Sequence, residues 1–399
     1  MNNKPISLSP PDITNEEINA VVDVLKSGWI TTGPVTKRFE TEISAFCGTD
    51  KSVCLNSATA GLELSLRVLG IGPGDEVITT AYTYTASASV IEHVGAKIIM
   101  VDTGVDSYEI DYDAVERAIT PNTKAVIPVD IAGVMCDYIR LKNILDSKKS
   151  LFSPANDLQK SIGRVAIVAD AAHSIGAVRD GMKSGQAADF TSFSFHAIKN
   201  VTTAEGGAVT WMTKPGISDH ELYKEFMLLS LHGQNKDALA KAKLGGWEFD
   251  IKCTGYKCNM TDIAAAIGSV QLKRYPVLLK RRREIVEIYN DGLKGLPCVP
   301  ITHICDTFES SMHLYLVRMN GKNAIERDAV FMKMAENQIA TLVHYKPLPM
   351  MTAYKQLGFD IKNYPNAYKQ FENEISLPIH TLLTNEDVYR VIDTFNKLI

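Results

Sequence analysis

The chain has 399 residues, of which 45% are hydrophobic and 22% are charged, and its formal net charge is −4. A chain of this length and composition can fold as a soluble protein with two domains that share an extensive core. The slightly negative charge argues against a nucleic-acid-binding protein or a protein of anionic membrane surfaces. No apolar run approaches the roughly 20 residues that a membrane helix needs.

The cysteines and the N-terminal segment indicate the compartment. The seven cysteines are scattered and odd in number, which is typical of reduced thiols. The segment MNNKPISLSPPDITNEE lacks the charged-then-apolar pattern of a secretory signal. Cys253 and Cys258 have neither a second cysteine pair nor a nearby histidine to complete a zinc site. We therefore expect a cytoplasmic protein without a bound metal.

Two helices are predicted at the start of the chain. The segment ITNEEINAVVDVLKSG is amphipathic, with Thr14 as N-cap, Glu17 in the capping-box position and Gly28 at the end. The sequence GWITTGP then predicts a loop, and VTKRFETEISAFCG a second helix.

From residue 51 to residue 211, apolar strand patterns alternate with helix patterns. Such continuously apolar strands are typical of a mostly parallel sheet that helices cover on both faces, so we expect an α/β fold. The polar section Lys148–Gly163 predicts a surface loop inserted before one of the strands. The expected strands are SVCLNS, DEVITT, KIIMVD, KAVIPVD, RVAIVAD, TSFSFH and GAVTW.

The alternation of strand and helix patterns ends after Trp211. The segment TGYKCNMTDIAAAIGSVQLKRYPVLLKRRREIVEIYNDGL has helical spacing, with a possible break near Pro276 and a basic cluster, Lys280–Arg283, that we expect on a solvated helix face. From about Pro297 onwards, strands and helices alternate again and suggest a smaller α+β domain. We predict a large domain with an N-terminal arm at residues 1–270 and a small C-terminal domain at residues 271–399.

A carboxylate and an amine follow two of the expected strands. The run Val165–Ala169 ends on Asp170, and the run Phe190–Phe195 leads to Lys199. A carboxylate at the end of a buried strand is costly unless it meets a cation, and a lysine just past a strand is a candidate nucleophile. Pyridoxal phosphate needs both groups, one for the Schiff base and one for the ring nitrogen. The pair therefore predicts a pyridoxal phosphate site, although each residue alone is more typical of a turn former or a solvated charge.

A candidate phosphate site follows the first strand. Ser57, Thr59 and Ala60 open a helix, whose N-terminus binds anions through free N–H groups and the helix dipole. Simple N-capping is the alternative interpretation. No Walker loop is present, and GIGPGDE is a poor dinucleotide motif because Pro73 occupies it.

Three further side chains lie near these positions in the sequence. Tyr82 and Tyr84 follow a strand and precede a helix, where either ring could stack on a flat cofactor or could simply pack. His173 follows Asp170 by three residues and could hold the carboxylate, lie over the ring or fill the start of a helix.

Six segments resemble one family, the DegT/DnrJ/EryC1/StrS sugar-nucleotide aminotransferases, and within it the UDP-4-keto-sugar branch. The similarity spans nearly the whole chain. It implies the aspartate-aminotransferase fold (PLP-dependent fold type I), with a mixed seven-stranded sheet in the large domain, and a homodimer whose active sites lie at the subunit interface. The segments are SATAGL, TAYTYTASA, VADAAHSIGA, SFSFHAIKNVTTAEGGAV, GYKCNMTDIAAAIGSVQLKR and ISLPIHTLLTNEDV.

The resemblance also implies roles for individual residues. Lys199 would form the Schiff base, Asp170 would pair with the pyridinium nitrogen, His173 would lie near the 3-hydroxyl group, and Tyr84 would stack on the ring. The phosphate would be held by the backbone of Thr59 and Ala60, the Ser194 hydroxyl, and Asn259 from the partner subunit. The sugar nucleotide would contact GWITTGP and VHYKPLP, through Thr31, Thr32, His344, Tyr345 and Lys346.

The implied reaction moves an amino group from L-glutamate, through pyridoxamine phosphate, to a nucleotide-linked keto-deoxysugar for lipopolysaccharide or another glycan. A sugar 3-dehydratase of the family would carry histidine in place of the Schiff-base lysine, whereas this chain has Lys199. A 3-keto-sugar aminotransferase of antibiotic biosynthesis and a non-catalytic regulator with the same fold stay open as alternatives. A nucleotide-binding oxidoreductase would need a glycine fingerprint that the sequence lacks.

Overall fold

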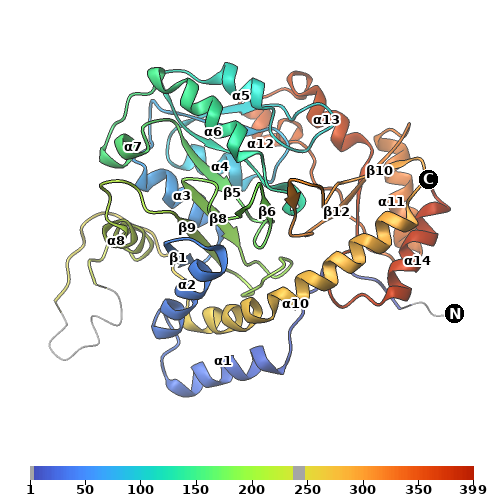
Figure 1. The fold of residues 1–399 in the computed structure, drawn as a ribbon, viewed down its shortest axis with the longest axis horizontal. Helices are drawn as coiled ribbons and strands as arrows, with labels where there is room; N and C mark the ends of the chain where they lie inside the picture. Colours follow the sequence, from blue (N-terminus) through green and yellow to red (C-terminus); the bar gives the residue numbers. More distant parts are fainter. Residues whose placement is uncertain (1–3, 237–247) are drawn as a thin grey trace.

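The computed structural model describes residues 4–236 and 248–399. Its main feature is one mixed sheet, made of β1 (Lys51–Leu55), β2 (Glu76–Thr80), β3 (Lys97–Val101), β4 (Thr123–Ile127), β5 (Ala166–Asp170), β8 (Phe190–Ser194) and β9 (Gly207–Trp211). These seven strands lie in the order β1-β9-β8-β5-β4-β2-β3. Figure 1 labels β1, β9, β8 and β5 in the middle of the large domain. Strand β9 runs antiparallel to both of its neighbours, β1 and β8, and the other neighbouring pairs are parallel. The predicted α/β fold with a mixed seven-stranded sheet is confirmed.

Helices cover both faces of this sheet. In β4, Ala125 and Ile127 pack into one apolar core, and the intervening Val126 packs into another on the opposite face. Both faces are therefore buried, which explains why the strands are apolar throughout. One core includes side chains of α3 (Ala58–Val68), α4 (Ala86–His93) and α8 (Asp219–Ser230), and the other includes those of α5 (Tyr112–Ala118) and α6 (Tyr138–Ser147).

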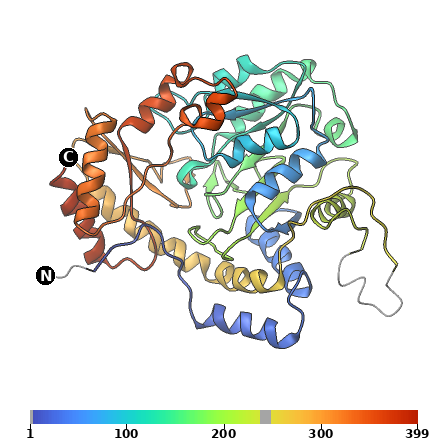
Figure 2. The ribbon, with the colours of Figure 1, turned by 180° about the vertical axis from the view of Figure 1, so that it is seen from behind.

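The first two helices form as the sequence predicts. Helix α1 (Asn15–Ser27) has Thr14 as N-cap, a capping box with Glu17, and Gly28 at φ 74° after its end. Helix α2 (Pro34–Cys47) follows the GWITTGP loop. Both helices lie against α10 (Asp262–Gly292), as Figure 2 shows from behind.

Helix α10 is continuous, so the expected break near Pro276 is wrong. Contacts on both sides of the proline hold the helix together and outweigh its one missing backbone hydrogen bond. Before it, the Tyr275 hydroxyl donates to the carbonyl of Ile175 at 2.7 Å, and after it, Arg282 donates to the carbonyl of Met312 at 3.1 Å. The predicted domain division at residues 270 and 271 thus falls inside a helix, and it stays a prediction.

The basic cluster on α10 is not a simple solvated face. Arg282 is buried, and burial lowers the pKa of its guanidinium to about 10. Arg283 lies at the surface, where it pairs with Glu309 at 2.7 Å. Sequence pattern alone could not separate these two arginines, because Arg282 donates to carbonyl groups that lie far away in the chain.

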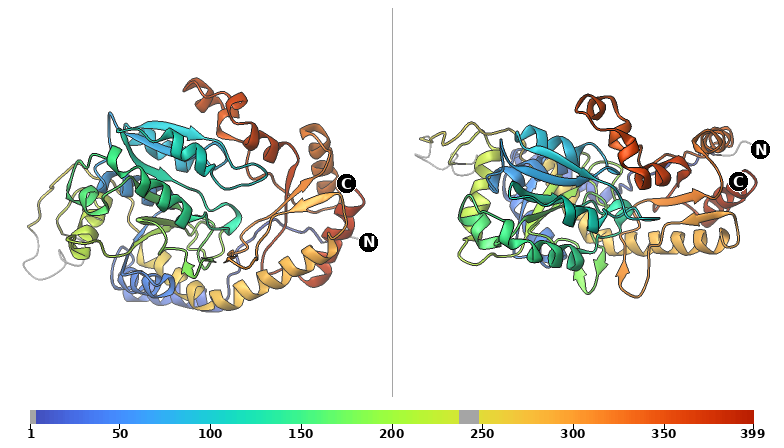
Figure 3. Two further views of the ribbon diagram at one scale, coloured as in Figure 1. Left: turned by 45° about the horizontal axis from the view of Figure 1, so that its top comes forward. Right: turned by 90° about the horizontal axis from the view of Figure 1, so that it is seen from above.

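The C-terminal part forms the expected α+β layer. A three-stranded antiparallel sheet carries α11 (Ala324–Glu336) and α14 (Asn385–Asn396), and α10 links this layer to the large sheet (Figure 3). The N-terminal arm also belongs here, because Ile6 lies in the same core and bridges to Ile339. The strands are β10 (Cys298–Pro300), β12 (Tyr315–Met319) and β13 (Glu374–Leu377).

Shorter elements connect these layers. Strand β11 pairs with β6, which forms a hairpin with β7. Side chains of the segment from η3 to α13 pack against the turn after β2. Their bounds are β6 (Val178–Arg179), β7 (Met182–Lys183), β11 (Phe308–Glu309), η1 (Ile131–Gly133), η2 (Lys149–Leu151), η3 (Leu348–Met350), η4 (Ile361–Asn363), α12 (Thr352–Gln356) and α13 (Pro365–Glu372).

The section Lys148–Gly163 is more than the expected surface loop. It contains η2 and a short helix, α7 (Asp157–Ile162). Leu158 joins the large core, and the buried Gln159 side chain donates to the carbonyl of Leu69 at 2.8 Å. A helix of fewer than two turns leaves too little periodicity for detection from sequence. In the part of the chain that the structure describes, no helix is long and apolar enough to cross a bilayer.

Candidate active site

Asp170 closes β5 and is almost fully buried. Its Oδ2 atom accepts a hydrogen bond of 2.6 Å from the Ser87 hydroxyl, and Oδ1 accepts one of 3.2 Å from the backbone N–H of Ala172. Burial raises the pKa of this carboxyl, while those two hydrogen bonds and the charge of Lys199 act in the opposite direction. Asp170 is therefore a costly buried acid that a further cation would stabilise.

Lys199 lies in the turn that follows β8, with its backbone N–H bonded to the carbonyl of His196 at 2.9 Å. Burial lowers the pKa of its amine to about 8, and the Asp170 carboxylate opposes that shift. The structure thus brings the two residues into one electrostatic site. About a tenth of an amine with this pKa is uncharged at pH 7, and the uncharged form is the nucleophile.

His173 is a neutral, oriented imidazole. Its pKa lies well below the usual value because of burial, and the nearby charge of Lys199 acts in the same direction. Its Nδ1 atom accepts a 3.2 Å hydrogen bond from the backbone N–H of Ala132, so the ring proton is on Nε2. That nitrogen lies 3.3 Å from the Tyr345 hydroxyl. Ala132 adopts φ 57° inside η1, a conformation that non-glycine residues seldom adopt.

The structure separates the two candidate tyrosines. Tyr82 is fully buried, and its hydroxyl donates to the carbonyl of His344 at 2.7 Å, which makes it a packing residue. Tyr84 is 61% exposed, and its ring centroid lies 6.2 Å from that of Tyr345. Of the pair, Tyr84 is the ring with a face available for stacking.

The candidate phosphate site lies where α3 begins. Ser57 is the N-cap, and its hydroxyl accepts from the N–H of Ala60 at 3.1 Å, so capping by Ser57 is observed. Ser194 pairs in register with Gly207 on β9. A Cβ atom on Gly207 would lie only 2.4 Å from the Ser57 carbonyl carbon. This close approach places the Ser194 strand end beside the helix start, where Thr59 and Ala60 are partly exposed.

Asn259 and the GWITTGP loop are bound to each other within one chain. The Asn259 amide donates to the Thr32 hydroxyl, which donates in turn to the carbonyl of Met260 at 2.5 Å. Thr32 is buried, and its hydroxyl is engaged in these two hydrogen bonds, whereas Thr31 is exposed. Asn259 also forms a bridge with Leu55 at the end of β1. Its predicted role in the partner subunit's site stays a prediction.

The segment 344–346 reaches the site through its first two residues. His344 is buried, Tyr345 is half-buried against His173, and Lys346 is exposed. Residues that the sequence did not single out complete the site. Ser87 and Ala132 hold Asp170 and His173, and His313 places its ring centroid 4.4 Å from that of His173. Their pairings join segments that are far apart in the chain, and no local pattern signals them.

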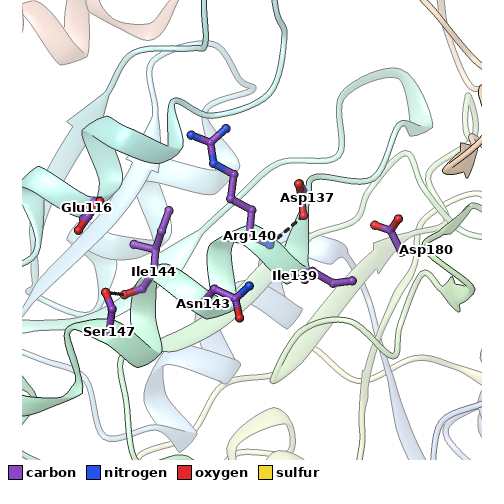
Figure 4. A pocket seen from close by; sticks show the side chains of 8 residues that line it. All are labelled: Glu116, Asp137, Ile139, Arg140, Asn143, Ile144, Ser147 and Asp180. Carbon is purple, nitrogen blue, oxygen red and sulfur yellow. Dashed lines mark hydrogen bonds between the residues drawn. The ribbon is translucent and has the colours of Figure 1, made fainter.

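A separate surface cavity lies away from this site. A cavity of about 510 Å³ lies over α6, and none of the site residues described above lines it (Figure 4). Figure 4 shows that its lining is polar and charged apart from two isoleucines; the lining residues are Glu116, Asp137, Ile139, Arg140, Asn143, Ile144, Ser147 and Asp180. Within the described ranges, no group of three or more His, Cys, Asp or Glu side chains is placed to bind a metal ion.

A mixed seven-stranded sheet, with an amine and an acid after neighbouring strands, defines an α/β enzyme with the fold of the PLP-dependent aminotransferases. The chain belongs to the DegT/DnrJ/EryC1/StrS aminotransferase family, whose model matches residues 11–396. The family resemblance seen in the sequence is confirmed.

Solved and curated relatives agree with this assignment. The chain is 56% identical to the putative sugar aminotransferase Spr1654 from Streptococcus pneumoniae in its PMP-form, with a TM-score of 0.96 and 98% of each chain covered. It is 29% identical to Helicobacter pylori PseC, an aminotransferase of pseudoaminic acid biosynthesis, with a TM-score of 0.85 and 99% of each chain covered. It is 35% identical to the spore coat polysaccharide biosynthesis protein SpsC of Bacillus subtilis, over 98% of this chain and 96% of SpsC.

Proposed function

We propose that the protein is a PLP-dependent aminotransferase that moves the amino group of L-glutamate to a nucleotide-linked keto-deoxysugar, with a UDP-4-keto sugar as the first candidate. The observation that carries this proposal is the Lys199 amine, whose pKa of about 8 is set by burial and the Asp170 carboxylate. The relatives named above act on sugars or in polysaccharide biosynthesis, which supports a surface glycan as the product.

The residues present fit pyridoxal phosphate. When bound, the cofactor supplies a protonated pyridine ring that draws electrons from the reacting carbon. Asp170 would keep the ring nitrogen protonated, because a buried acid that lacks a full cationic partner gains by pairing with one. The N-terminus of α3 and the Ser194 hydroxyl would hold the phosphate, and the open face of Tyr84 would cover the ring.

Lys199 would do the proton transfers. Its Nζ atom would take the proton from the α-carbon of glutamate and later return a proton to the sugar carbon that receives nitrogen. An amine with a pKa near 8 can act in both directions close to neutral pH. His173, held by Ala132 with its proton on Nε2, would donate toward a ring oxygen or toward Tyr345.

We also propose a homodimer in which Asn259 serves the partner's phosphate site. The Asn259 amide lies in the polar turn that opens α10, and it is only partly buried within one chain. Its bridge to Leu55 fixes this turn beside the sheet edge and so gives a second subunit a rigid surface to meet.

A panel of UDP-, dTDP- and GDP-linked 4-keto and 3-keto sugars, incubated with the purified protein and glutamate, tests the proposal. We expect mass spectrometry to find an amino sugar with at least one UDP-4-keto sugar, and no product with Lys199→Ala. Amination of only 3-keto sugars would move the assignment to the antibiotic type. Loss of a sugar hydroxyl without gain of nitrogen would indicate the dehydratase. The absence of a reaction with every nucleotide sugar in the panel would indicate a regulator.

A further inference from the structure

Two polar residues on β13 point away from the core of the C-terminal layer. Side chains alternate along a strand, and Ile375 and Leu377 occupy that core. Glu374 and Ser376 therefore face the other way, toward the segment that carries His344. Both are fully buried, although a glutamate is rarely buried without a specific partner.

These two residues hold His344 at two points. One Glu374 oxygen accepts the backbone N–H of His344 at 2.9 Å, and the other accepts the Ser376 hydroxyl at 2.6 Å. The same hydroxyl lies 2.8 Å from Nδ1 of the His344 ring. Acid, hydroxyl and imidazole thus form a continuous chain of hydrogen bonds in a dry environment.

A serine hydroxyl has a single proton, and this restricts the chain to two arrangements. When Glu374 is ionised, Ser376 donates to it and accepts from Nδ1–H of His344, which leaves a lone pair on Nε2. When Glu374 is protonated, it donates to Ser376, and Ser376 donates to Nδ1, which places the ring proton on Nε2. The imidazole itself stays neutral, since burial and Lys199 lower its pKa to about 3.

The His344 imidazole lies within electrostatic reach of the site described above. His344 is close enough to Lys199 for the ammonium charge to lower its pKa. The next residue, Tyr345, meets the His173 ring. A change at the His344 nitrogens therefore alters the hydrogen-bonding character of the site itself.

We propose that Glu374 and Ser376 are positioning residues that decide which ring nitrogen of His344 carries the proton, and so whether the active site meets a donor or an acceptor there. Calling this region the active site rests on the proposed function; the coupling between Glu374 and His344 does not.

The groups around Glu374 fix the pH at which the arrangement changes. Burial raises the pKa of Glu374 to about 8, while Ser376, the His344 N–H and the Arg327 charge act against that rise. Arg327 on α11 donates to the carbonyl of Glu374 at 3.0 Å. The tyrosines that feel the Glu374 charge have pKa values raised by burial, so they stay neutral over the same range; they are Tyr82, Tyr108 and Tyr345.

Nitrogen-15 NMR of histidine-labelled protein, without cofactor or substrate, tests the coupling directly. In the wild type we expect His344 to carry its proton on Nε2 in about tenfold excess at pH 7 and on Nδ1 in about tenfold excess at pH 9. Glu374→Gln should keep the proton on Nε2 at both pH values, because the amide N–H₂ donates to Ser376 permanently. Ser376→Thr retains the hydroxyl and should retain the switch, while Ser376→Ala should abolish it.

Ser310→Ala is the matched control. It removes a hydroxyl that lies 2.6 Å from Nδ1 of another buried histidine, His303, and it should leave the His344 switch unchanged. A wild-type His344 with one tautomer from pH 6.5 to 9.5 would overturn the proposal without requiring any variant. So would a switch that persists in Ser376→Ala. Neither result depends on amino transfer, so failure of the proposed function would be recognised separately.

Discussion

The Ser87 hydroxyl donates a 2.6 Å hydrogen bond to the Asp170 carboxylate, and it thereby joins the first turn of α4 to the end of β5. The Thr83 hydroxyl lies 2.8 Å from the same Ser87 oxygen. A short relay of hydroxyl groups therefore holds the acid on which the ring nitrogen of the cofactor would depend. It also opposes the rise in the pKa of Asp170 that burial causes.

Ser87→Ala should raise the pKa of Asp170 further and weaken its hold on a ring nitrogen. A hydrogen bond to a charged group contributes about 1.5–3 kcal/mol, so we expect kcat to fall by about ten- to a hundredfold. Ser89→Ala, on the same helix but partly exposed, is the control and should stay close to wild type. Equal rates for the two variants would contradict a role for the Ser87 hydroxyl in supporting Asp170.

The pKa of Lys199 predicts a pH dependence for cofactor capture. Because that pKa is lowered to about 8, the reactive neutral amine should increase about tenfold per pH unit below 8 and level off above it. Stopped-flow absorbance during pyridoxal phosphate binding measures this rate. Lys224→Ala, which alters an exposed lysine that pairs with Glu221, should give the same profile. A rate that keeps rising to pH 10.5 would show an ordinary solvated amine.

The folded protein should also gain stability as the pH rises from about 8 to 10.5. Lys199 binds fewer protons folded than unfolded between its folded pKa of about 8 and its ordinary value of 10.5. The free energy of unfolding should therefore carry a destabilising contribution below pH 8 that disappears by pH 10.5. Denaturant unfolding of the wild type and Lys199→Met across pH 7–10 isolates the contribution of Lys199 to the free energy of unfolding. Parallel pH curves for the two proteins would contradict it.

The close approach of Gly207 to the start of α3 allows a steric test of the candidate phosphate site. Gly207→Ala would place a Cβ atom 2.4 Å from the Ser57 carbonyl carbon and push the start of α3 off the sheet. We expect a loss of about 1–3 kcal/mol in stability and weaker binding of pyridoxal phosphate. Gly72→Ala is a suitable control, because its nearest neighbour would be 3.7 Å away. Unchanged affinity for pyridoxal phosphate in Gly207→Ala would contradict the prediction that the start of α3 binds the phosphate.

Mixed dimers test the shared site. Asn259→Ala and Lys199→Ala should each be inactive alone, but a mixed dimer would contain one site with both residues intact if Asn259 comes from the partner. Unfolding and refolding equal amounts together should then restore about a quarter of the wild-type activity, from random pairing. No recovery, with mixed dimers confirmed by native mass spectrometry, would place Asn259 in its own chain's site.

The sequence predicted the strands of the sheet and the first helix, because each has a local signature: an apolar strand or a capping box. The joint role of Asp170 and Lys199 at a cofactor was inferred from polar residues after two strands, and it stays a prediction. The sequence did not predict the continuity of α10 through Pro276 or the burial of Arg282, since both depend on carbonyl groups from distant segments. The local pattern did not distinguish Tyr82 from Tyr84, the family resemblance favoured Tyr84 for stacking, and their burial in the structure separates them. Ser87, Ala132 and Glu374 act through long-range hydrogen bonds, which no spacing rule detects.

The most direct test of the central claim is peptide mass spectrometry after the protein is incubated with pyridoxal phosphate and reduced with borohydride. We predict loss of absorbance near the visible edge and one stable modification, on Lys199. Asp170→Asn should still be modified, whereas Lys199→Ala should not. Modification of a different lysine, or none at all in a folded sample, would contradict the account.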